Sequence, residues 1–277
     1  MESDSMEFFK EAEAADSGLY SKVSEDDIFC ESFNGTTYLV KNTDTDEMYT
    51  AKVYRPEVED SEKNKFSGNI SKIIHLNHPS ILPIYAYMFD FEDCDDQLTV
   101  LTKYLPNAYS LRKIFSNQEE IEQWTPAKRY ANLITIAYAM QYIHAQGIKH
   151  GNLKPGNILL DDNFYPILYD FCLSWLFRSK YRYNVGNDIS NKFNNDDSIL
   201  YLAPEILDNL KNQSITFSSD TYSFSLIAYE LITGQKPFDL SKSGFDTYYE
   251  YAQHIRKNKI RPDLSIIKDE KIKSFLN

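Results

Sequence analysis

The sequence predicts an α+β fold, with a small sheet lobe followed by a larger and mostly helical lobe. Segments with the β-branched and aromatic pattern of strands are concentrated before residue 105, where a single helical segment interrupts them. Beyond that point the apolar residues recur with helical spacing instead. We therefore expect a sheet lobe at 27–104 and a helical lobe at 105–277, preceded by an acidic and mobile tail at 1–26.

Four strand-like runs and one helical run account for the first lobe. Polar or acidic turns join the strand-like runs in pairs, as in antiparallel hairpins. These runs cover residues 36–40, 48–54, 81–91 and 97–104. Between the second and third, residues 61–76 carry Phe66, Ile70, Ile73 and Ile74 at helical spacing, which predicts a helix with one buried face.

Two helices of the second lobe have clear start and stop signals. Thr125-Pro126 favours a helix start, because the threonine hydroxyl can accept from an unpaired amide and proline fits the first turn. Gly147 can end that helix. A second helix is predicted at 219–233, with Gly234 as its stop signal.

Composition restricts the class of partner. Hydrophobic residues make up 42% of the 277 residues, enough for a packed interior. The net charge of −12 argues against nucleic-acid binding and against docking on anionic lipid. No apolar run is long enough to span a membrane, and the three cysteines have neither zinc-site nor disulfide spacing. We therefore expect a cytoplasmic protein without nucleic-acid or membrane partners.

The most informative segment, 150–160, reads His-Gly-Asn-Leu-Lys-Pro-Gly-Asn-Ile-Leu-Leu. It resembles the catalytic loop of protein kinases, whose usual form is H-R-D-L-K-P-E-N-I-L-L. Further kinase landmarks lie in the expected order, namely Lys52, His78-Pro79, Asp170-Phe171-Cys172, Ala203-Pro204-Glu205, Asp220 and Gly234. The resemblance covers roughly residues 28–275 and implies the bilobal kinase fold. The lysine of Leu-Lys-Pro is similar to that of the serine/threonine and tyrosine-kinase-like branch.

In this family an aspartate of the catalytic loop accepts the proton of the attacking hydroxyl. The matching position carries an amide, Asn152, which cannot hold a proton at neutral pH. General-base catalysis contributes about 10²- to 10⁴-fold, so this substitution predicts that phosphotransfer has been lost. No acidic residue lies within 150–160, although an aspartate from outside the loop remains the alternative.

The resemblance also implies a site for Mg²⁺. Asn157 and Asp170 match the two kinase positions that hold magnesium through oxygen atoms, the ligands that this cation prefers. A structural alternative is that Asp170 caps a turn and that Asn157 bonds the backbone of the loop.

For ATP, the resemblance implies contacts from Lys52, Gly35, Thr102, Leu105, Asn157 and Asp170. Several features weaken this site. Two of the three glycines of the phosphate-covering loop are replaced, and Asn69 stands where a helix glutamate normally pairs with the lysine. Thr37 and Thr50 would present hydroxyls to the adenine, and each hydroxyl needs a hydrogen-bond partner. We expect the binding of ATP and Mg²⁺ to be weak or absent.

Three further positions concern catalysis, regulation and stability. Lys154 matches the lysine that touches the transferred phosphate, so it joins Asn152 as a candidate catalytic-site residue. Gly151 replaces the arginine that reads phosphorylation of the activation loop. That loop would lie within 170–205, a polar segment that we expect to be mobile. The final kinase helices are absent from the sequence, from which we expect either a truncated C-terminus or a helix supplied by a partner, and an unpaired Glu205.

Positions that support the fold are kept, whereas positions that support the reaction are replaced. This contrast favours a pseudokinase that works as a binding or scaffold module for a protein partner. The alternative is a weak serine/threonine protein kinase that transfers the γ-phosphate of ATP to protein hydroxyls. It rests on the retained Lys52, Lys154, Asn157 and Asp170.

Overall fold

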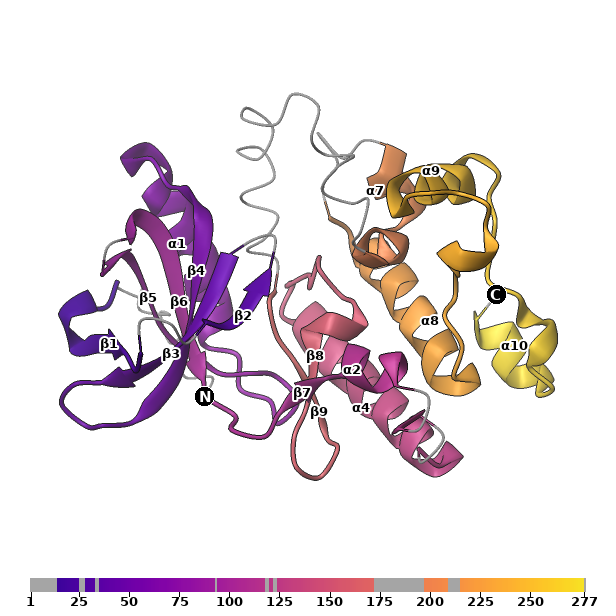
Figure 1. The fold of residues 1–277 in the computed structure, drawn as a ribbon, viewed down its shortest axis with the longest axis horizontal. Helices are drawn as coiled ribbons and strands as arrows, with labels where there is room; N and C mark the ends of the chain where they lie inside the picture. Colours follow the sequence, from indigo (N-terminus) through magenta and orange to yellow (C-terminus); the bar gives the residue numbers. More distant parts are fainter. Residues whose placement is uncertain are drawn as a thin grey trace, which may run out of the picture. The chain divides into compact units, whose positions relative to one another are not determined.

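A computed structural model describes residues 14–24, 28–32, 35–92, 94–117, 120–121, 124–171, 197–208 and 215–276. The chain divides into two compact units, one of residues up to 77 together with 83–104, and the other of residues 78–82 and 105–277. The first unit is built around a sheet and the second is mostly helical (Figure 1). The predicted α+β fold is confirmed.

A six-stranded antiparallel sheet organises the first unit. Its strands run in the order β1-β3-β4-β6-β5, and β2 also pairs with β3. Their bounds are β1 Tyr20–Lys22, β2 Ile28–Ser32, β3 Gly35–Asn42, β4 Met48–Glu57, β5 Ile84–Phe91 and β6 Cys94–Lys103. Each strand-like run of the sequence therefore lies in a strand, with ends that differ by a few residues.

The sheet begins earlier than the sequence predicts. A short 3₁₀ helix, η1 (Ser17–Leu19), leads into β1, which pairs with residues 40–42 of β3. The Tyr20 ring lies edge-on to Tyr49, with centroids 5.8 Å apart, and Lys22 forms an ion pair with Glu92 at 2.6 Å. The expectation of a mobile tail through residue 26 is thus wrong for 17–22, because these side chains find partners on the sheet. Residues 1–13 lie outside the described part.

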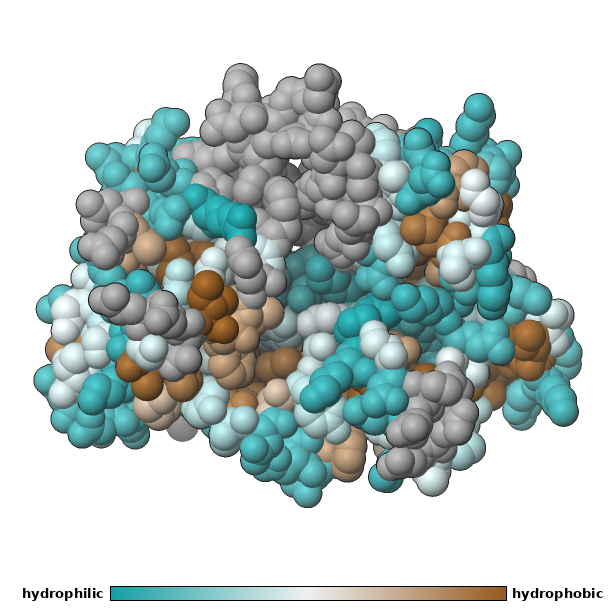
Figure 2. Space-filling view, viewed as in Figure 1, coloured by the Kyte–Doolittle hydropathy of each residue, from teal (hydrophilic) through white to brown (hydrophobic). Residues whose placement is uncertain are grey.

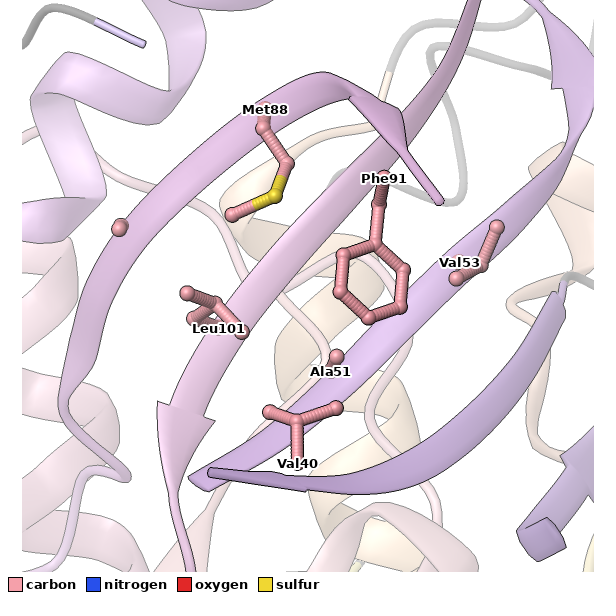
Figure 3. Close-up of a cluster of buried hydrophobic side chains, with 7 residues drawn as sticks. Val40, Ala51, Val53, Met88, Phe91 and Leu101 are labelled. Atoms are coloured by element: carbon pink, nitrogen blue, oxygen red, sulfur yellow. The ribbon is translucent and has the colours of Figure 1, made fainter. Parts of the chain in front are cut away.

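Apolar side chains gather on one side of this sheet (Figure 3). The cluster consists of Val40, Ala51, Val53, Ala86, Met88, Phe91 and Leu101. Helix α1 (Asp60–Ile74) buries Phe66, Ile70 and Ile73 and packs against β5. Three members of the predicted helical stripe are therefore buried, whereas the fourth, Ile74, is only partly buried.

The second unit combines helices with a small sheet, β7-β8-β9. Its helices and strands are β7 Tyr109–Ser110, α2 Leu111–Ser116, α4 Pro126–Ala145, η2 Pro155–Asn157, β8 Ile158–Leu160, β9 Pro166–Leu168, η4 Asp197–Tyr201, α7 Pro204–Asp208, α8 Phe217–Thr233, η5 Leu240–Lys242, α9 Tyr248–Lys257, η6 Leu264–Ile266 and α10 Glu270–Leu276. Helices α4 and α8 pack against each other (Figure 1).

The start signal of α4 and the stop signal of α8 act as predicted, whereas α8 starts at Phe217, before the predicted start at Ser219. The Thr125 hydroxyl accepts from the amide of Lys128 at 3.3 Å, which caps α4. Helix α8 begins at a capping box formed by Thr216 and Ser219, and it ends at Gly234 in the left-handed conformation with φ 70°. These caps fix where the two central helices of this unit begin and end.

A buried ionic cluster joins α2, η4 and α8. The Tyr201 hydroxyl donates to Glu230 Oε2 at 2.5 Å and accepts from Arg112 at 2.8 Å. Arg112 also lies 3.5 Å from Glu230 Oε1 and 3.4 Å from Asp197, which contacts Lys236 at 3.5 Å. Glu230 is only 1% exposed. Burial raises its pKa to about 7, against the opposing effects of Arg112 and Tyr201.

The raised pKa of Glu230 should make stability depend on pH. The native carboxyl has a pKa of about 7 against 4.5 for the ordinary group, so its ionisation opposes folding as the pH rises through this window. Between pH 5 and pH 7 the contribution of Glu230 should fall by about 2 kcal/mol. Urea unfolding at pH 5 and pH 7 would measure the free energy of unfolding of the wild-type chain and of Glu230→Gln, whose side chain cannot ionise.

The comparison of slopes separates Glu230 from other groups. Burial lowers the pKa of His150, so its contribution rises with pH, opposite in sign to that of Glu230. The Glu230→Gln variant keeps the histidine contribution. Its stability should therefore increase from pH 5 to pH 7 relative to the wild type, whereas equal slopes would contradict the assignment.

Gly35 allows the close approach of β3 to β4. A Cβ atom built at this position would lie 2.1 Å from the carbonyl oxygen of Val53. We expect Gly35→Ala to lower the free energy of unfolding by about 1–3 kcal/mol. Gly68 in α1 is the matched control, because nothing lies within 4 Å of its added Cβ. Gly68→Ala should stabilise by up to about 1 kcal/mol, as measured by urea denaturation. Equal stability of Gly35→Ala and the wild type would contradict this expectation, because β3 and β4 would then accept the added Cβ at no cost.

Candidate nucleotide and phosphotransfer site

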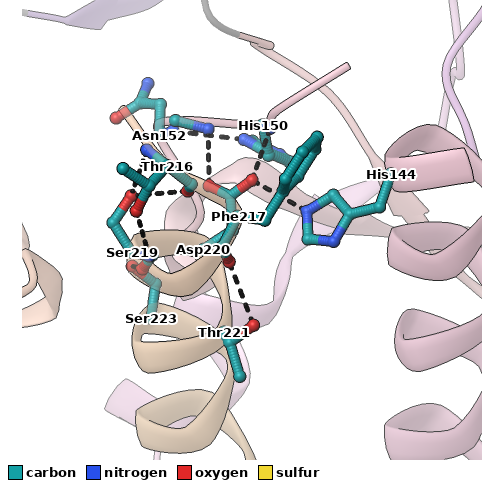
Figure 4. Close-up of polar contacts among 10 residues, drawn as sticks. His144, His150, Asn152, Thr216, Phe217, Ser219, Asp220, Thr221 and Ser223 are labelled. Atoms are coloured by element: carbon teal, nitrogen blue, oxygen red, sulfur yellow. Dashed lines mark hydrogen bonds and ion pairs between the residues drawn. The ribbon is translucent and has the colours of Figure 1, made fainter. Parts of the chain in front are cut away.

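The loop at 150–160 is held in place by a buried carboxylate of α8 (Figure 4). Asp220 is 2% exposed and accepts from the backbone amides of His150 and Gly151, each at 2.8 Å. Its Oδ2 also lies 3.0 Å from His144 Nε2. Gly151 has φ 69°, a conformation that suits glycine. Asp220 therefore connects the start of the loop to α8 and α4.

Asn152, the residue in place of the catalytic base, contacts a predicted metal ligand. Its Nδ2 donates to Asp170 Oδ2 at 2.7 Å. Its backbone amide donates to His150 Nδ1 at 3.3 Å. Asp170 has φ 61°, which lies in the left-handed region that side-chain-bearing residues seldom adopt. The amide therefore meets a carboxylate whose backbone conformation is itself unusual.

Asn157 completes this group of polar side chains. It is 5% exposed, and its Nδ2 donates to the backbone oxygen of Asn152 at 2.7 Å. The same nitrogen lies 3.5 Å from Asp170 Oδ2. The structural alternative, a bond from Asn157 to the loop backbone, is thus present. It uses the amide nitrogen, so the amide oxygen of Asn157 can still serve as a ligand.

These side chains fit a divalent cation only in part. Asp170 supplies the one carboxylate of the trio, because Asn152 and Asn157 are neutral. No group of three or more His, Cys, Asp or Glu side chains suited to a metal occurs among the described residues. Magnesium typically takes one or two carboxylates together with substrate phosphates. Asp170 and the Asn157 oxygen would hold such an ion, and the ion would neutralise phosphate charge.

Two other predicted residues lie in the same unit. Lys154 is half-buried and precedes the 3₁₀ turn η2, where its backbone oxygen accepts from the Asn157 amide at 2.9 Å. Leu105 opens the unit, and its oxygen accepts from the Ala108 amide at 3.2 Å. The roles of both residues in binding stay predictions.

The remaining predicted nucleotide residues lie in the sheet unit. Lys52 is in β4, paired between Thr37 and Val100, and its Nζ lies 5.0 Å from the Tyr54 ring centroid. Gly35 opens β3, and Thr102 lies in β6. Asn69, the residue in place of the pairing glutamate, lies on α1. Its Nδ2 donates to the Lys65 backbone oxygen at 2.8 Å, so its amide bonds its own helix.

The hydroxyl of Thr50 has the hydrogen-bond partner that a buried hydroxyl needs. Its Oγ1 lies 2.7 Å from Thr102 Oγ1, across the β4–β6 pairing. This bond offsets the cost of burying a hydroxyl on the sheet. The presence of Thr50 therefore does not by itself disturb the strand.

Several contacts were not predicted from the sequence. His144, which contacts Asp220, and Phe217, whose ring lies 4.8 Å from His144, were both missed. The ionic cluster around Glu230 was missed as well. A signal was available for it, because Glu230 is a charged residue between Tyr229 and Leu231 in the apolar part of α8. Such a residue needs a buried partner.

Glu205 and Arg261 both lie near Tyr222. The guanidinium carbon of Arg261 is 5.8 Å from the centre of the Tyr222 ring. Burial raises the pKa of Tyr222, Arg261 lowers it and Glu205 raises it. The ion pairs found among the described residues do not include Glu205, and the expectation that it is unpaired stays a prediction. Cys172 and residues 172–196 of the predicted mobile segment lie outside the described residues.

Comparison with known proteins gives the family. The model of the protein kinase domain matches residues 32–277. "Protein kinase and PP2C-like domain-containing protein" of Arabidopsis thaliana is 30% identical over 63% of this chain and 26% of its own length. "Dual specificity protein kinase shkB" of Dictyostelium discoideum is 28% identical over 78% of this chain and 31% of its own length.

A third relative is named as inactive. "Inactive leucine-rich repeat receptor-like serine/threonine-protein kinase At1g60630" of Arabidopsis thaliana is 31% identical over 63% of this chain and 25% of its own length. The chain thus spans less than a third of the length of these relatives. Within the described residues, no helix has both the length and the apolar character needed to cross a membrane. From the match over residues 32–277, we conclude that this chain belongs to the protein kinase domain family.

Proposed function

We propose that this chain is a pseudokinase of the serine/threonine, tyrosine-kinase-like branch, acting as a binding or scaffold module for a protein partner. The single observation that carries the proposal is the amide of Asn152, which donates to Asp170 Oδ2 at 2.7 Å. A kinase needs a proton acceptor at this position. The amide offers no basic site, and its NH₂ group is already directed at the carboxylate of Asp170.

The architecture around this position supports the same proposal. Asp220 still anchors the loop, and the Phe171 ring still lies against the ring of His150, with centroids 4.8 Å apart. The loop is therefore formed although position 152 carries no base. The printed name of one relative, an inactive receptor-like kinase, is consistent with loss of activity within the family.

Phosphotransfer from radiolabelled ATP to a generic protein substrate tests the proposal. We expect the natural chain to stay at background. Asn152→Asp restores the base, and Asn152→Asp with Asn69→Glu also restores the helix glutamate that in active kinases pairs with the lysine matching Lys52. If the restored forms are active, they should exceed the natural chain by about 10²- to 10⁴-fold. Turnover of the natural chain at ordinary kinase rates, or within a few fold of the restored forms, would contradict the proposal.

The second candidate function is a weak serine/threonine kinase. It is favoured by Asn157, which bonds the loop through its amide nitrogen, because the amide oxygen is the atom that a cation would take. It also draws on Lys52, Lys154 and Asp170, which are retained.

Calorimetric titration with ATP, with and without Mg²⁺, separates the two functions. We expect a dissociation constant weaker than about 1 mM, equivalent to less than about 4 kcal/mol of binding free energy. The second candidate instead requires saturable binding that depends on Mg²⁺ and is lost in Asp170→Asn. Such binding would favour the weak kinase, whereas its absence at millimolar nucleotide would rule that candidate out.

A further inference from the structure

The contact between Asn152 and Asp170 has a structural consequence apart from the missing base. Two amide nitrogens lie near one carboxylate oxygen, Asn152 Nδ2 at 2.7 Å and Asn157 Nδ2 at 3.5 Å from Asp170 Oδ2. Both present N–H groups to a negative charge, which is the favourable orientation. Hydrogen-bond donors from the chain itself therefore partly neutralise Asp170.

The conformation of Asp170 needs such support. Its φ of 61° is unfavourable for a residue with a side chain, so surrounding interactions must hold it. Tyr169, the residue before, donates its amide to the Asn157 backbone oxygen at 3.2 Å. Phe171, the residue after, is 3% exposed and packs against His150. The bond to Asn152 therefore secures a turn that also places a buried ring.

An aspartate at position 152 would turn this attractive contact into a repulsive one. Its carboxylate would stand where the amide now lies, 2.7 Å from the carboxylate of Asp170. Two like charges at this distance repel unless a cation lies between them. A loop with both carboxylates would thus be less stable than the natural loop, and a divalent cation between them would reduce the repulsion.

We propose that Asn152 is a positioning residue whose amide takes the place of a cation, so that the loop and the turn at Asp170 stay formed without bound metal. The favourable contact with Asp170 and the absence of a base at position 152 follow from the same side chain. The proposal stands independently of the proposed function, because it concerns stability without nucleotide, whether or not the chain transfers phosphate.

Thermal unfolding of the full chain without nucleotide tests this, first in a chelator and then in millimolar Mg²⁺ or Mn²⁺. The wild-type midpoint should not change with cation. In the chelator, Asn152→Asp should melt about 5 °C lower, and either cation should restore most of the loss. The matched control is Asn107→Asp, the same chemical change at an exposed turn of the same unit, and it should show no dependence on the cation.

A further variant separates repulsion from the loss of a bond. Asn152→Ala removes the donor without adding charge, so it should melt below the wild type by the same amount with and without cation. A wild-type midpoint for Asn152→Ala would overturn the proposal, because the hydrogen bond would then contribute nothing. A wild-type chain that gains as much from Mg²⁺ as Asn152→Asp would overturn it too, as would insensitivity of Asn152→Asp to the cation.

Discussion

The carboxylate of Asp220 is the contact on which the candidate site depends. It receives two backbone amides from the loop at 150–160 and lies against His144 of α4, so one side chain connects α8, α4 and the loop. Hydrogen bonds from backbone donors to a buried charge are among the stronger interactions in a protein. Without this acceptor, the amides of His150 and Gly151 would lose their partner and Asn152 would lose its fixed position.

The contacts that shape the loop are separate from the group that would accept a proton. The bonds that shape the loop involve backbone amides and the nitrogen of Asn157, and none of them needs a basic group at position 152. The asparagine side chain has nearly the same volume as that of aspartate, and it adds a hydrogen-bond donor. Packing and hydrogen bonding therefore tolerate a change that proton transfer does not.

The sequence was sufficient for the fold because its signals are local. The caps at Thr125 and Gly234 and the stripe on α1 depend on neighbouring residues, and both caps and three of the four stripe residues appear as expected. The partners of side chains far apart in sequence were not predictable in this way. The bond from Asn152 to Asp170 and the cluster of Arg112 with Glu230 depend on tertiary geometry. The edge strand at 20–22 was not predicted, because the acidic composition of residues 1–26 indicated a mobile tail and Tyr20 alone is a weak signal for a strand.

That edge strand bears on where the domain should be considered to start. The family match begins at residue 32, whereas the sheet begins at residue 20. A fragment cut at the family boundary would leave the backbone of β3 at residues 40–42 without its neighbour. Unpaired strand edges readily join other chains, so such a fragment would be prone to self-association for reasons unrelated to the kinase loop.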